Sequence, residues 1–155
     1  MNIANYTSGV AAIRSIADIE EILIAHGAVS VNKRVVDGKI SAVAFAIPFE
    51  NHLINICLPA NVENVFAVMK RDRAQRTSRV LTVDLQEKLL AQAERTAWRI
   101  QWEWVRVQMA LVRMRQVELL EVFLPYVITD DRGTTLYSQI RERKFAGLLP
   151  APTTP

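Results

Sequence analysis

The sequence contains few of the residues on which most catalytic and metal sites depend. Of its 155 residues only one is a cysteine, Cys57, so one chain can form neither an internal disulfide nor a cysteine-based zinc site. The two histidines, His26 and His52, do not have the HExxH spacing of zinc hydrolases, and no metal site is expected. The P-loop and GxSxG motifs are also missing. We therefore expect a protein that is not an enzyme and uses no cofactor.

Long apolar runs are missing as well. No run reaches the roughly 18 apolar residues that a membrane span needs. The first residues, MNIANYTSGV, do not show the basic and then apolar pattern of a signal peptide. Together with the single cysteine, this predicts a protein of the cytoplasm that makes no contact with a membrane.

The order of apolar patterns predicts an α+β fold. A first helix is followed by three strand-like runs, a second helix, and a helical C-terminal half built on one long helix. Asp37-Gly38 is a typical two-residue hairpin turn, so the strands should form a three-stranded antiparallel meander. The expected strands cover residues 29–35, 40–47 and 52–58.

Length and composition predict one folded domain. We expect it to span residues 1–149, with a sheet-containing half at 1–69 and a helical half at 82–149. Residues 150–155 should form a proline-rich tail. The helix–sheet–helix order of the first half is also that of double-stranded-RNA-binding domains, but residues 61–65 do not carry the basic cluster of that family.

The long helix should run from Thr82 to about Gln116, since no glycine or proline interrupts this stretch. Thr82 or Asp84 can cap its start. One apolar face, which we expect to be the core face, carries Leu85, Leu89, Ala93, Ala97, Ile100, Trp104, Val107, Leu111 and Met114.

A second apolar strip lies beside this face and consists of Trp98, Val105, Met109 and Val112. Apolar residues surround more of the helix than one small sheet can cover. We therefore expect that another copy of the chain covers part of this strip, in a homodimer or a larger ring.

The opposite side of the helix carries an arginine and tryptophan stripe, made of Arg95, Arg99, Trp102, Arg106 and Arg113. Guanidinium groups could hold phosphates there while a base stacks on the indole. The alternative is a solvated face whose arginines pair with acids such as Glu103 or Glu118.

A second basic stretch precedes the long helix. It contains one acid and five basic residues, Lys70, Arg71, Arg73, Arg76 and Arg79, without apolar periodicity. We expect either a solvated connection or the end of the preceding helix. Residues 70–155 hold fifteen basic and ten acidic side chains, whereas residues 1–69 hold four and six. This asymmetry favours an anionic partner.

Several short motifs resemble a family. They are Ala97-Trp98-Arg99, Trp104-Val105, Gln108 with Ala110-Leu111, residues 121–126 (EVFLPY), and Gly133 with Thr135-Leu136-Tyr137. They are similar to the C-terminal half of a group of small bacteriophage and prophage proteins, in which an AWR…WV…Q.AL helix leads into an EV-hydrophobic-LPY segment. The resemblance implies a phage-encoded protein of the host cytoplasm, and it brings no catalytic residues with it.

Two functions fit these patterns. The first is a nucleic-acid-binding accessory protein that uses the arginine and tryptophan stripe and the basic stretch at 70–79. The alternative is an oligomeric anti-defence protein that captures a small phosphorylated ligand, such as a nucleotide, or a host protein. An open nucleic-acid surface should bind with a strong salt dependence, whereas an enclosed ligand site should not.

Overall fold

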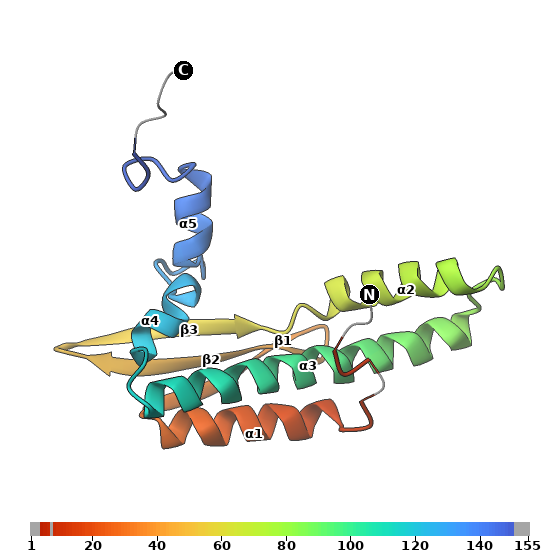
Figure 1. Ribbon diagram of the computed structural model, residues 1–155, viewed down its shortest axis with the longest axis horizontal. Helices are drawn as coiled ribbons and strands as arrows, with labels where there is room; N and C mark the ends of the chain where they lie inside the picture. The colour runs from red at the N-terminus through yellow and green to blue at the C-terminus, as the bar shows by residue number, and fades with distance from the viewer. Residues whose placement is uncertain (1–3, 7, 151–155) are drawn as a thin grey trace.

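The computed structural model describes residues 4–6 and 8–150, and it has the α+β architecture predicted from the sequence (Figure 1). The elements are α1 (Ala12–Ala25), β1 (Ser30–Val36), β2 (Lys39–Phe49), β3 (His52–Pro59), α2 (Val62–Arg76), α3 (Val83–Arg113), α4 (Leu119–Phe123), the 3-10 helix η1 (Leu124–Tyr126) and α5 (Leu136–Glu142). Of the predicted tail at 150–155, residues 151–155 lie outside the described residues.

The three strands form the expected antiparallel meander in the order β1-β2-β3. Asp37 and Gly38 both have positive φ, as the tight turn between β1 and β2 requires. The sheet then has two different faces, because side chains alternate along each strand. Large residues of β2, such as Phe45, belong to the main core, whereas Ala42, Ala44 and Ala46 lie on the opposite face.

The core lies between the sheet and the helices α1 and α3. It combines Ile16, Ile19 and Leu23 of α1, five strand residues that include Phe45, and Trp98 with its neighbours on α3. Phe123 of α4 closes one end of this core: its ring makes edge contacts with Phe45, at 5.1 Å between centroids, and with Trp104, at 5.8 Å. Residues from both halves of the chain therefore share one core.

The predicted long helix is confirmed as a single element, and the Oγ1 of Thr82 accepts a hydrogen bond from the backbone N–H of Leu85 at 3.4 Å. Its predicted core face is wrong in part, because Val107 and Met114 are 50% and 58% exposed. The buried residues are Ala93, Thr96, Ala97, Trp98, Val105 and Met109. Since α1 and α2 both pack against α3, more than one side of this helix is covered.

The helix α2 extends to Arg76, so most of the basic stretch is the end of this helix, which is one of the two alternatives expected from the sequence. The helices α2 and α3 form a hairpin that projects beyond the sheet (Figure 1). At the other end of the molecule, α5 stands away from the sheet and the long helices, and it packs against η1. In the described part of the chain, no helix combines the length and the apolar character that crossing a membrane would require.

An N-terminal segment of the chain is docked on α3, which the sequence did not suggest. The Nε2 of Gln92 donates hydrogen bonds to the carbonyl oxygens of Tyr6, at 2.7 Å, and Ser8, at 3.2 Å. The Oγ1 of Thr96 donates to the carbonyl oxygen of Asn5 at 3.1 Å. This contact covers part of the helix surface on which the arginine stripe begins.

Candidate functional site

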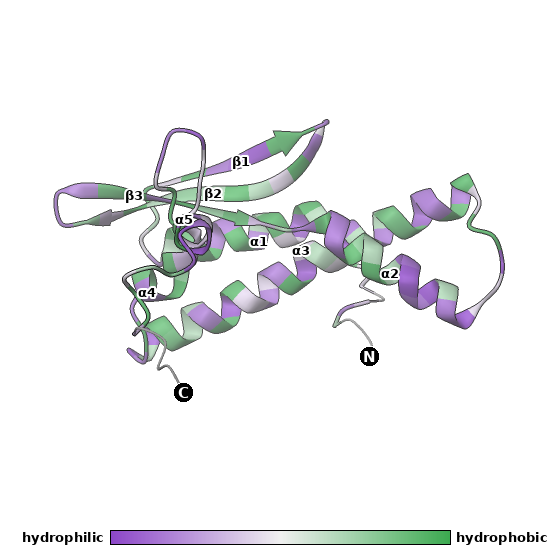
Figure 2. Cartoon of the chain, turned by 90° about the horizontal axis from the view of Figure 1, so that it is seen from above, coloured by the Kyte–Doolittle hydropathy of each residue, from purple (hydrophilic) through white to green (hydrophobic). Residues whose placement is uncertain are grey.

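The end of the α2–α3 hairpin carries the densest positive charge in the chain. We call residues 70–81 the hairpin tip. The tip contains Lys70, Arg71, Arg73, Arg76 and Arg79 and one acid, Asp72. Figure 2 shows that the turns of α2 leading to this end are mostly hydrophilic. The tip therefore combines positive charge with a position at the extremity of the molecule.

A cavity of about 400 Å³ opens in the hairpin tip. Its lining consists of Lys70, Arg73, Ala74, Thr77, Ser78, Arg79 and Leu81, so that three cations and two hydroxyl groups surround it without an acidic side chain. The Nε of Arg73 is buried and has no hydrogen-bond acceptor among the described residues. A buried N–H group without an acceptor costs about 1–3 kcal/mol.

Two other cations of the tip, Arg71 and Lys70, have neighbours within the chain. The Nε of Arg71 lies 4.0 Å from a carboxylate oxygen of Asp72. The Nζ of Lys70 lies 5.1 Å from the centre of the Phe66 ring, a cation–π contact that still leaves the ammonium group at the cavity. The net charge of the tip remains positive, since Asp72 is its single acid.

The arginine and tryptophan stripe on α3 is not one continuous exposed surface. Arg95 donates to the carbonyl oxygen of Ser8, at 3.3 Å, and to the Oε1 of Gln92, at 2.5 Å, and so helps to hold the N-terminal segment. The Nε of Arg99 lies 3.5 Å from the carboxylate of Glu103, as the solvated-face alternative predicted. These two arginines already have partners in the folded chain.

The remaining members of the stripe have different surroundings. Trp102 is half-buried and packs against the main core, so its ring is not a free stacking platform. Arg106 and Arg113 are exposed and form no ion pair with any residue that the structure describes. Only these two arginines of the stripe are free to meet a phosphate without breaking an internal contact.

The predicted oligomer interface is wrong for three of its four residues. Trp98, Val105 and Met109 are at most 1% exposed in a single chain, where they belong to the core. Val112 is half-buried and packs against the same core. The physical reason is that α1 lies along α3, and Trp98, Val105 and Met109 share the core with α1 and the sheet, so these three residues are covered within one chain.

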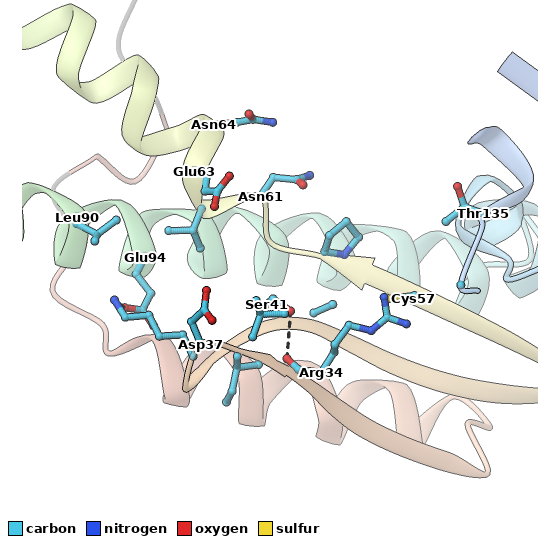
Figure 3. A pocket seen from close by; sticks show the side chains of 17 residues that line it. Arg34, Asp37, Ser41, Cys57, Asn61, Glu63, Asn64, Leu90, Glu94 and Thr135 are labelled. Atoms are coloured by element: carbon cyan, nitrogen blue, oxygen red, sulfur yellow. Dashed lines mark hydrogen bonds and ion pairs between the residues drawn. The ribbon is translucent and has the colours of Figure 1, made fainter. Parts of the chain in front are cut away.

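A larger cleft, of about 660 Å³, lies between the β1–β2 hairpin, the start of α2 and α3 (Figure 3). The carboxylates of Asp37 and Glu63 face into one end of it, and Arg34 is directed toward the other end. Lys39 and Glu94 are also part of the lining and pair with each other at 3.6 Å. The volume falls within the range of ligand-binding clefts.

The far end of this cleft is closed by the loop that follows η1. The guanidinium of Arg34 lies so close to Gly133 that a Cβ atom added there would sit 3.3 Å from its Nη2. Asp130 organises the same loop by accepting hydrogen bonds from the backbone N–H groups of Arg132, at 3.0 Å, and Thr134, at 2.9 Å. The hydroxyl and the N–H of Thr134, followed by Arg132, hold the pKa of Asp130 below its usual range.

The described residues contain no cluster of acids, histidines or cysteine that could hold a metal ion. Cys57 is buried, and its position on β3 places it in the lining of the large cleft. Comparison with protein-family models, curated proteins and solved structures gives no match to this chain. The resemblance to phage proteins therefore stays a prediction from the sequence.

Sequence reasoning singled out the basic stretch but missed both cavities. The residues around the large cleft come from β1, β2, the start of α2, α3 and the loop at 133–135, and no local pattern connects them. Asn61 is one of these residues. It precedes α2 with a φ of 50°, and its side chain makes no capping hydrogen bond and instead lines the cleft.

Proposed function

We propose that this protein is a non-enzymatic nucleic-acid-binding protein, encoded by a phage, whose hairpin tip contacts the phosphate backbone. The observation that carries the proposal is the cavity in the tip, which three cations and two hydroxyl groups line without an acid. The oxygens of a phosphodiester accept hydrogen bonds and carry negative charge, so a site of cations and hydroxyl groups without an acid suits them. The phage origin rests on the resemblance of the sequence motifs.

The position of Arg73 in the lining supports the same assignment. A guanidinium group can donate two parallel hydrogen bonds to one phosphate, so it matches phosphate geometry better than an ammonium group does. A hydrogen bond between charged groups contributes roughly 1.5–3 kcal/mol, so the loss of one such contact should weaken binding by about tenfold or more.

The projecting shape of the hairpin supports an open surface rather than an enclosed one. The tip lies beyond the sheet, where a long polymer can pass it without colliding with the rest of the fold (Figure 1). Contacts to phosphates position a protein without reading the base sequence. We therefore infer binding that depends strongly on salt and weakly on sequence.

The test is fluorescence anisotropy with labelled single-stranded and duplex DNA of mixed sequence, across a range of salt concentrations. If Lys70, Arg73 and Arg79 each neutralise one phosphate, the slope of log K against log salt should be about −2.7 for duplex DNA and about −2 for single strands. The double change Arg73→Gln, Arg79→Gln should make the duplex slope less negative by about 1.8.

A matched control is available on α3. The double change Arg106→Gln, Arg113→Gln removes the same charge from exposed positions outside the tip, and it should change the slope much less. If the control lowers affinity and the tip change does not, the stripe is the site and the tip is not. If neither changes the binding of any nucleic acid, both surfaces are ordinary solvated faces.

Capture of a small phosphorylated ligand by the tip is the second candidate. The cavity of about 400 Å³ is large enough for such a ligand, which is the observation that favours it. A nucleotide that competes with labelled DNA, and whose own affinity changes little with salt, would support this function. Binding of DNA without competition by nucleotides would exclude it.

A further inference from the structure

The C-terminal segment at 136–149, which we call the arm, has apolar side chains that its own chain does not cover. Leu148 and Leu149 are 63% and 65% exposed, and Tyr137 is half-exposed. The helical part of the arm has seven residues, too few to be stable by itself in water. Its apolar side chains therefore need a surface to pack on.

The arm is also basic. Arg141, Arg143 and Lys144 surround a single acid, Glu142, just before the exposed leucines. A surface that receives the arm should therefore combine an apolar floor with free carboxylates.

The large cleft has both properties. Its floor and walls include Val36, Ile40, Val62 and Leu90. Lys39 and Glu94 neutralise each other in their ion pair, whereas Asp37 and Glu63 have no ion-pair partner among the described residues.

At the other end of the cleft the charge is reversed. Arg34 lies there and has no carboxylate partner among the described residues. The cleft therefore offers two free carboxylates to the basic residues of an arm, and one cation to its Glu142.

The path of the chain decides which arm can occupy the cleft. Gly133 and Thr135 line the cleft, so each arm starts at the rim of the cleft of its own chain. From there α5 leads away from the sheet (Figure 1). The exposed leucines are thus carried away from their own cleft, but their starting point lies beside it. A two-fold axis at this rim brings the cleft of a second copy beside the start of each arm.

We propose that two copies of this chain form a dimer in which the arm of each copy docks in the large cleft of the other. Leu148 and Leu149 bury their side chains against the apolar lining, and the basic residues of the arm face Asp37 and Glu63. The interface is reciprocal, so it closes on itself and stops at two copies. It is separate from the hairpin tip.

The test is the mass of the full chain in solution, measured by light scattering and sedimentation at micromolar concentrations. We expect twice the 17.5 kDa of one chain. The double change Leu148→Ser, Leu149→Ser should produce the monomer mass with an unchanged circular dichroism spectrum. Val80→Ser, Val83→Ser is the matched control, since both valines are exposed outside the arm, and it should leave the dimer intact.

A second pair of variants tests the cleft itself. Asp37→Asn, Glu63→Gln removes the two free carboxylates and should weaken dimerisation at least tenfold, and asparagine tolerates the positive φ of position 37. A monomer mass for the wild-type chain would overturn the proposal, as would a mass that grows beyond two copies with concentration. A dimer that survives both the arm and the cleft variants would overturn it as well.

Discussion

Replacing Trp98 by alanine tests whether α3 is held by the core of its own chain. Trp98 is 0% exposed and belongs to the core shared by α1, the sheet and α3. Truncation of a buried tryptophan to alanine typically costs about 3–5 kcal/mol. Domains of this kind have a total stability of about 5–15 kcal/mol, so we expect the free energy of unfolding to fall by a large fraction.

A milder change at the same position separates packing from hydrogen bonding. The indole Nε1 of Trp98 is buried and has no acceptor among the described residues, which costs about 1–3 kcal/mol. Trp98→Phe removes this orphan donor but also gives up apolar contact worth about 1 kcal/mol. The two effects have opposite signs, so this variant should stay within about 1.5 kcal/mol of the wild type.

The assay is urea unfolding followed by circular dichroism, with all variants at one protein concentration. Trp102→Ala is the control, because Trp102 lies on the same helix but is only half-buried, and it should cost less than Trp98→Ala. The mass of the folded particle in solution, which reports its number of chains, should stay the same in every variant. If Trp98→Ala costs less than about 1 kcal/mol and instead lowers the mass, the strip is an oligomer interface and the reasoning from burial fails.

Two further predictions concern local contacts. Arg95→Ala should loosen the N-terminal segment, because the Arg95 side chain donates hydrogen bonds to the carbonyl oxygen of Ser8 and to the side-chain oxygen of Gln92. Limited proteolysis before residue 9 should become faster, whereas the unfolding midpoint should change little. Asp130→Asn should remove a pH dependence of stability. Folding lowers the pKa of Asp130, so the ionised carboxylate stabilises the folded loop above about pH 4. This contribution is lost as the pH falls through the folded pKa. Thermal unfolding between pH 7 and pH 3 should therefore show a steeper loss for the wild type than for the variant, and equal losses would contradict the role given to Thr134.

Much of the fold could be predicted because its signals are local. The Asp37-Gly38 turn sets the pairing of β1 with β2, and Thr82 marks the start of a helix that no glycine or proline interrupts. The basic stretch could be recognised from composition alone. The end of α2 could not be predicted, because the helix extends to Arg76 through residues without apolar periodicity. Packing against α3 stabilises this part of the helix.

The direction in which the long helix faces could not be read from its sequence. The helix α3 has two apolar strips, and helical periodicity indicates only how hydrophobic each strip is, not which of them is buried. In the folded chain the strip with Trp98 and Met109 is the buried one, because α1 and the sheet meet there. The same arrangement leaves Val107 half-exposed.

The sequence by itself determined the elements, their order, the antiparallel sheet and the uneven charge, since these depend on neighbours a few residues apart. Tertiary structure decided that Arg95 is not free, because its side chain donates to the carbonyl oxygen of Ser8, far away in the chain. The pairing of Arg99 with Glu103 spans one helical turn and was among the alternatives that the sequence offered. Tertiary structure also created the large cleft, because the side chains that line it come from separate elements and meet only once those elements have packed.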